Sequence, residues 1–184
     1  MQFNHDNMHG VRLAESLVNM LADGPWDSNA LQDLLTGHLF RSPRITPKYQ
    51  DELREWAVRL QTVFAAEDQE ARCSAVNALL AGGVRRVFLT THDGMLPHLH
   101  FADASETLVE RVRAVTAGGL AIFMTEAAGE RLGVCALRDC GRVFADTSRG
   151  GNRAYCSARC GNADAVQRYR GRLRAGYQSQ GVLS

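Results

Sequence analysis

The chain has 184 residues, of which 45% are hydrophobic and 22% are charged, and its formal net charge is +1. This composition is typical of a folded protein with a hydrophobic core, and it excludes an intrinsically disordered chain. The sequence contains no apolar run of membrane-spanning length, and no secretory signal segment opens it. We therefore expect a cytoplasmic protein whose cysteines are in a reducing compartment.

Four helices are predicted in the first half of the chain. Apolar residues recur at helical spacing in four stretches, near residues 13–21, 28–35, 46–63 and 73–80. Ser28 and Thr46 are predicted as N-caps of the second and third helices, and Cys73 is predicted on the buried face of the fourth. The first ten residues are polar and carry few signals of ordered structure.

A hairpin is predicted after these helices, with strands near residues 84–91 and 96–101. His92, His98 and His100 lie in or beside it, and we interpret them as part of a solvated face. A metal-binding or acid–base role is the alternative, but spacing fixes no third ligand, acid or nucleophile. The sequence also has no P-loop, dinucleotide-binding or G-x-S-x-G motif, so we expect no enzymatic activity.

A further helix is predicted after the hairpin. Asp103 and Glu106 are interpreted as a capping box at its start, and Gly118-Gly119 predicts a bend or a break within it. With the preceding elements, this predicts an α+β protein in which residues 1–134 form a mainly helical domain with one hairpin.

Four of the five cysteines lie in the last third of the chain. They form two close pairs, Cys135 with Cys140 and Cys156 with Cys160, and fifteen residues separate the pairs. A tetrahedral zinc ion takes about four thiolates at roughly 2.3 Å, and two pairs on two turns supply them. Two disulfides are the alternative, but a reducing compartment favours zinc.

The residues around these cysteines predict a treble-clef-like finger. Gly141 directly after the first pair allows the tight backbone turn of a zinc knuckle. Alternation in residues 142–145 and 153–155 predicts a hairpin between the pairs. Ser157 is predicted as the N-cap of a helix that begins at the second pair.

Charge is divided unevenly along the chain. Residues 1–134 carry twelve basic and seventeen acidic side chains, a balance of −5, whereas residues 135–184 carry nine arginines and three aspartates, a balance of +6. Four thiolates around one zinc dication lower the second value to about +4. A basic C-terminal region favours a polyanionic partner.

The helix predicted over residues 162–175 combines an apolar stripe, formed by Val166, Tyr169 and Leu173, with arginines at one-turn spacing on other faces. We interpret the arginines of this region as contacts to nucleic acid, and a solvated basic face is the alternative. The predicted contacts are Arg153, Arg159, Arg168, Arg170, Arg172 and Arg174. Residues 176–184 are predicted to be a disordered tail.

The run C-x4-CGRVFADTSR, followed by NRAYCSARCGN and an arginine-rich helix, resembles the CGNR zinc-finger family. These are bacterial proteins in which the finger follows a larger N-terminal domain called ABATE. The segments LAESLVNML and VNALLA are similar to parts of that domain. The chain departs from the family pattern at Ala163, which replaces the arginine of the family name, and at Asp164, which replaces a basic residue.

The resemblance implies a zinc-binding transcription regulator. Residues 135–175 would bind DNA, or RNA, and residues 1–134 would sense a small-molecule ligand or form a homodimer. The alternative is a protein-interaction module, in which zinc has a purely structural role in the C-terminal region and the arginines bind an acidic partner.

Overall fold

The computed structural model describes residues 5–24, 26–38, 40–41, 43–91, 97–103, 105–127 and 129–180, with the backbone alone at 5–7 and 174–180. Within these ranges the chain forms six helices and two antiparallel hairpins, which confirms the α+β class. The helices are α1 (His5–Asp23), α2 (Ser28–Gly37), α3 (Pro47–Ala65), α4 (Gln69–Gly83), α5 (Leu108–Glu126) and α6 (Ala158–Gln180). The strands are β1 (Phe88–Thr90), β2 (His98–His100), β3 (Leu132–Val134) and β4 (Val143–Ala145).

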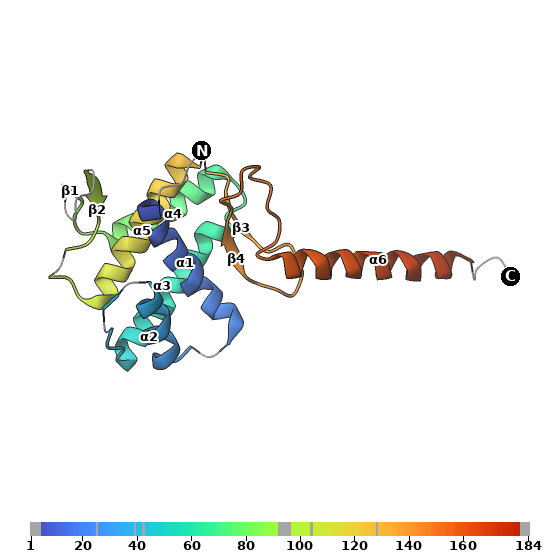
Figure 1. Ribbon diagram of the computed structural model, residues 1–184, viewed down its shortest axis with the longest axis horizontal. Coiled ribbons are helices and arrows are strands. Elements are labelled where there is room, and N and C mark those ends of the chain that lie inside the picture. The colour runs from blue at the N-terminus through green and yellow to red at the C-terminus, as the bar shows by residue number, and fades with distance from the viewer. Residues whose placement is uncertain are drawn as a thin grey trace.

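Helices α1 to α5 form the body of the molecule, and α6 projects away from it (Figure 1). Large apolar side chains on the facing sides of these helices form one core, and residues of β3 and β4 belong to the same core. Its largest fully buried side chains are Trp56, Phe64 and Phe123. The apolar residues that recur at helical spacing in the sequence are therefore the ones that are buried. Helix α1 begins at His5, which lies within the first ten residues, where few signals of ordered structure were found.

Helices α1 and α5 cross at two glycines, Gly10 and Gly119. A Cβ atom at Gly119 would lie 2.7 Å from the Cα atom of Gly10, so only glycine allows this close approach. A Cβ atom at Gly118 would lie 2.3 Å from the Phe101 ring. The predicted break at Gly118-Gly119 is wrong, because α5 is continuous, and both glycines lie at close packing contacts.

Two predicted helix caps are also wrong. The side chain of Asp27, one residue before Ser28, accepts from the Ala30 N–H and caps α2. At α5 the capping box consists of Thr107 and Glu110 rather than Asp103 and Glu106. The predicted Thr46 cap of α3 is confirmed, with its hydroxyl accepting from the Tyr49 N–H.

The buried polar residue of α4 is Arg72. Its guanidinium donates to the carbonyls of Val63, Ala66 and Gly129 and so joins α3 and α4 to the turn after α5. Cys73 is exposed, so the prediction that it is buried is wrong. The buried face of α4 is formed by Arg72, Val76 and Leu79 and does not include Cys73.

The hairpin β1–β2 forms as predicted, with Leu89 paired to Leu99. The Nε2 atoms of His98 and His100 lie 3.1 Å apart on its other face, and His92 lies outside the described residues. His98 and His100 are half-buried, whereas Leu89 and Leu99 on the opposite face are exposed, so the interpretation of His98 and His100 as a solvated face is wrong.

The second hairpin, β3–β4, is attached to α1 by side chains on one face of that helix. The Asn19 side chain donates to the Val143 carbonyl at 3.1 Å and accepts from the Val143 N–H at 2.7 Å. One turn earlier, Glu15 accepts from the Ala145 N–H at 3.4 Å. One turn later, Asp23 pairs with Arg142 at 2.6 Å. The face of α1 therefore satisfies the free edge of β4 as a neighbouring strand would.

Replacing Asn19 by Ala is expected to lower the free energy of unfolding by about 1–3 kcal/mol, because both backbone groups of Val143 lose their partner in a buried site. Urea denaturation followed by circular dichroism measures the change. The exposed Asn77 on α4 provides the matched control, and Asn77→Ala should stay within about ±0.5 kcal/mol. Equal values for the two variants would contradict this role of Asn19.

Candidate metal centre and basic helix

The first cysteine pair lies in the turn of the β3–β4 hairpin. The pairing of Val134 with Val143 continues through a hydrogen bond from the Cys135 N–H to the Arg142 carbonyl, at 2.8 Å. The Cys140 N–H then donates to the Leu137 carbonyl at 3.0 Å, which closes the knuckle. Gly141 has φ +66°, the left-handed conformation that its position after the first pair predicts.

The strand partner predicted for residues 142–145 is wrong. These residues pair with β3, whereas residues 153–155 are not a strand and contribute one backbone bond, from the Ala136 N–H to the Ala154 carbonyl. Their alternating pattern has another cause, since Tyr155 packs on α6 and the Arg153 guanidinium covers the Phe144 ring at 5.0 Å. The strand that pairs with residues 142–145 therefore precedes Cys135 in the chain.

The second pair lies at the start of α6. The Ser157 hydroxyl accepts from the Cys160 N–H at 3.2 Å, which confirms Ser157 as the cap of this helix. This bond fixes the first turn of α6, so that Cys156 and Cys160 face the knuckle.

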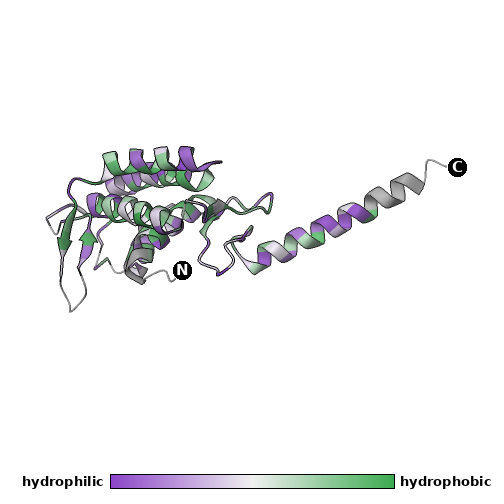
Figure 2. Cartoon of the chain, turned by 90° about the horizontal axis from the view of Figure 1, so that it is seen from above, coloured by the Kyte–Doolittle hydropathy of each residue, from purple (hydrophilic) through white to green (hydrophobic). Residues whose placement is uncertain are grey.

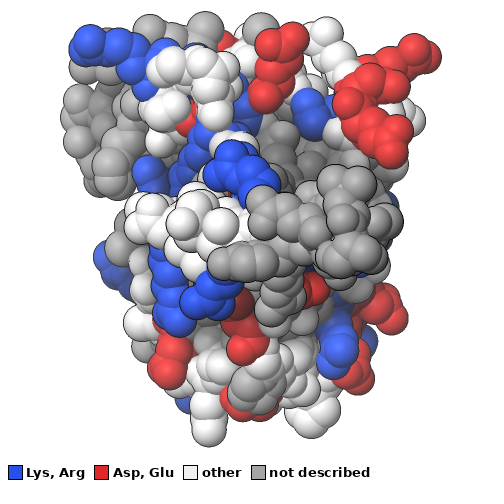
Figure 3. Space-filling model, turned by 90° about the vertical axis from the view of Figure 1, so that its right-hand side faces the viewer, with Lys and Arg blue, Asp and Glu red and all other residues white. Residues whose placement is uncertain are grey.

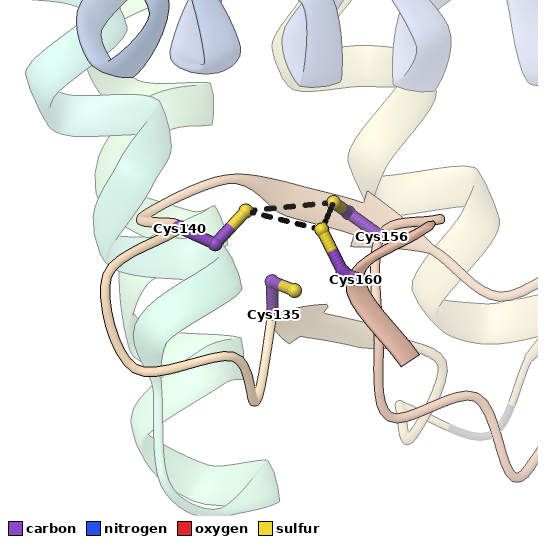
Figure 4. A group of neighbouring side chains, drawn as sticks. All are labelled: Cys135, Cys140, Cys156 and Cys160. Carbon is purple, nitrogen blue, oxygen red and sulfur yellow. Dashed lines mark hydrogen bonds between the residues drawn. The ribbon is translucent and has the colours of Figure 1, made fainter. Parts of the chain in front are cut away.

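The four cysteine sulfurs gather at one point between the knuckle and α6 (Figure 4). The Sγ atoms of Cys140, Cys156 and Cys160 form a triangle with sides of 3.5, 3.6 and 3.7 Å. The sulfur of Cys135 completes the group, and all four lie within 4.8 Å of one another. Sulfurs at roughly 2.3 Å from one tetrahedral ion lie about 3.8 Å apart, whereas a disulfide bond is about 2.05 Å long. The arrangement therefore suits a metal ion, and none of the five cysteines forms a disulfide.

The protonation of these thiols also fits a cation. Burial, followed by hydrogen bonds from neighbouring thiols, raises the pKa of Cys156 to about 12. Hydrogen bonds from Ser157 and Cys156 lower the pKa of Cys160 to about 7. Burial raises the pKa of Cys140. Several adjacent thiolates are not stable without a compensating charge, and a bound dication supplies it.

The loop between the pairs is organised by Asp146, a residue that the sequence analysis missed. Its side chain is buried and accepts from the backbone N–H groups of Ser148 at 2.8 Å and Arg153 at 2.9 Å. Burial acts to raise its pKa, but these hydrogen bonds and the charge of Arg131 outweigh burial and leave the pKa lowered. The local sequence D-x-S after a strand is typical of such an Asx turn and is the signal that could have identified it.

Among the predicted nucleic-acid contacts whose side chains the structure describes, Arg153 and Arg168 have structural partners. The Arg153 guanidinium donates to the carbonyls of Tyr155 and Cys156, and thus braces the backbone beside a metal ligand. Arg168 pairs with Asp164 at 2.7 Å, and Asp164 also accepts from the Tyr155 hydroxyl at 2.8 Å. The family departure at position 164 therefore places a carboxylate against an arginine that is still 67% exposed.

The remaining predicted contacts lie along α6. Arg159, Arg170 and Arg172 are exposed, and the side chain of Arg174 lies outside the described residues. The apolar stripe of this helix is exposed as well, with Val166 and Leu173 each 47% and Tyr169 57% exposed. Figure 2 shows the resulting mixture of polar and apolar residues along the projecting helix, which extends past residue 175 to Gln180.

Within the part of the chain that the structure describes, none of the helices has the length and apolar character needed to span a bilayer. No curated protein matches the chain. The similarity of the helical body to the ABATE domain stays a prediction. The family model of the CGNR zinc finger matches residues 131–173, which include β3, the knuckle, the Asp146 loop and most of α6. This part of the chain is a CGNR zinc finger.

Proposed function

We propose that the chain is a zinc-dependent regulator of transcription that binds DNA through the CGNR finger and α6. The observation that supports this most directly is the division of charge. The finger and the C-terminal region carry nine arginines against three aspartates, while the rest of the chain has a balance of −5. Zinc, bound by the four cysteines, is the metal that suits a closed all-thiolate tetrahedral site.

The position of α6 supports the same proposal. The helix extends from the body, so its exposed arginines are accessible to a long polyanion without interference from the acidic helices (Figure 1). The end of the molecule from which α6 projects has basic side chains near the centre of the view and acidic side chains toward the upper right and the lower edges (Figure 3). Arginines in this arrangement are suited to contacting phosphates along one side of a nucleic acid.

The salt dependence of DNA binding tests the proposal. Fluorescence anisotropy with labelled oligonucleotides should detect binding at about 50 mM salt, with log Kd rising steeply against log salt because bound arginines release counterions. An absence of DNA and RNA binding at that salt concentration, where electrostatic attraction is strong, would overturn the proposal.

A protein-interaction module is the second candidate, and the exposed stripe of Val166, Tyr169 and Leu173 favours it. Phosphate contacts leave such a stripe in water, whereas an apolar groove rimmed by carboxylates would cover it and pair with the arginines. Substituting Leu173 by Ser separates the candidates. The change should weaken capture of a protein partner and leave phosphate-driven DNA binding nearly unchanged.

The helical body completes the proposed regulator. We assign it ligand sensing or homodimer formation and no enzymatic activity, in a protein that acts in the cytoplasm. The hydrogen bonds of Glu15 and Asn19 to β4 support a connection between body and finger, because a shift of α1 would move the strand that carries the knuckle.

A further inference from the structure

A hollow lies on the finger between the segment before the second cysteine pair and the first turns of α6. Its volume is about 580 Å³, which is within the range of small-molecule sites, roughly 300–1,000 Å³. Its lining includes Arg153, Tyr155, Ser157, Gly161 and two asparagines, Asn152 and Asn162. The metal ligands are not among these residues, so the hollow is a separate feature of the finger.

Tyr155 lines the hollow, and two contacts with α6 hold its side chain. The Tyr155 hydroxyl donates to Asp164 at 2.8 Å, and that bond raises the pKa of the tyrosine. The ring itself lies against Gly161, where a Cβ atom would be 3.3 Å from the ring carbon Cδ2. Glycine at position 161 thus lets the ring approach α6 closely, and the ring stays oriented beside the hollow.

Five lining residues carry polar side chains, and those of Arg153, Tyr155 and Ser157 already have partners within the finger. Asn152 and Asn162 are exposed, and their side chains make no hydrogen bond to other residues in the described ranges. Each carboxamide offers two donors and one acceptor in a plane, a pattern that pairs with the edge of a nucleobase. Ala154 and Ala158 add apolar surface, and no lining residue carries a carboxylate.

The arginines of α6 lie at a suitable distance from this hollow. Arg170 follows Asn162 by eight residues, which corresponds to about 12 Å along a helix axis. A strand whose base entered the hollow could therefore place a neighbouring phosphate beside Arg170, whereas Arg172, two residues later, faces the other side of the helix. The combination of one aromatic side chain, edge-pairing amides and a basic helix is suited to a single strand with an unstacked base.

We propose that the hollow binds one unstacked nucleobase, so that the preferred ligand of the finger is single-stranded or locally opened DNA. The inference rests on the proposed function and adds the class of nucleic acid. A base in a continuous duplex cannot enter the hollow unless it first leaves the stack.

The test uses the zinc-loaded full-length protein and three labelled oligonucleotides of equal length: a single strand, its duplex, and the single strand with abasic sites in place of bases. The single strand should bind at least about fivefold more tightly than the abasic strand, which is the lower limit for one stacked base. Asn162→Ala and Tyr155→Leu should remove most of this difference, while Tyr155→Phe, which keeps the ring and its packing on Gly161 but loses the bond to Asp164, should retain part of it.

Bound zinc and circular dichroism verify that each variant is folded, and Asn77→Ala on α4 is the control for loss of an exposed amide. Binding that is equal for the normal and abasic strands, or unchanged in Asn162→Ala and Tyr155→Leu, would overturn the hollow as a base site while leaving DNA binding intact. A protein that binds none of the three oligonucleotides would instead overturn the proposed function and, with it, this inference.

Discussion

Removing zinc is expected to unfold the second half of the finger and to leave the helical body folded. The loop from Asp146 to Ser157 has little apolar core, and structural zinc supplies on the order of 10–16 kcal/mol of apparent binding free energy in small fingers. Strand β4 behaves differently, because Val143, Phe144 and Ala145 are all buried and the edge of the strand is bound to α1. Hydrogen exchange after chelation should therefore show lost protection at residues 154–161, with protection retained in α1 and α5.

The chain offers a matched control for this experiment. Cys156→Ser should reduce bound zinc and reproduce the effect of chelation, whereas Cys73→Ser, at an exposed cysteine outside the cluster, should change neither. Zinc affinity should also fall as the pH is lowered, because the Cys156 thiol, with its pKa of about 12, must lose its proton to become a ligand. Less than about half an equivalent of zinc in freshly purified, reduced protein would contradict the metal assignment.

The sequence predicted the helices of the body well because their apolar spacing follows the burial that tertiary packing requires. It predicted their ends less well. Several residues near each boundary can serve as a cap, and Asp27 beside Ser28 or Thr107 beside Glu106 cannot be distinguished without the backbone conformation. An error of one to four residues follows directly from this local redundancy.

The strand pairing of the finger was outside the reach of sequence patterns. Alternation identified residues 142–145 as a strand, but the partner of a strand is decided by tertiary contacts, and β3 was not assigned. Asn19 was missed for the same reason, because its partner Val143 is 124 residues away. The cysteine spacing, in contrast, correctly predicted that four cysteines lie together. Four ligands of one ion must be close in space, whatever the fold of the chain between them.

Replacing Arg170 and Arg172 together by Ala is expected to flatten the salt dependence of DNA binding by up to about two units of log Kd against log salt. Each arginine that contacts a phosphate releases about one counterion, so the loss of two contacts removes about two. Affinity should fall similarly on all sequences, because phosphate contacts carry no sequence information. Both side chains are exposed, so the fold and the zinc content should not change.

Two further variants make the result specific to position. Arg168→Ala should change the salt dependence less than Arg170→Ala or Arg172→Ala does, because Asp164 already lies 2.7 Å from the Arg168 guanidinium. Ala163→Arg restores the family pattern beside the start of α6 and should strengthen binding by roughly 1 kcal/mol or more if its charge meets a phosphate. An unchanged slope in the double variant would show that neither Arg170 nor Arg172 contacts the phosphates. Binding of a protein partner to the exposed apolar stripe of α6 would then explain the basic helix better than DNA binding does.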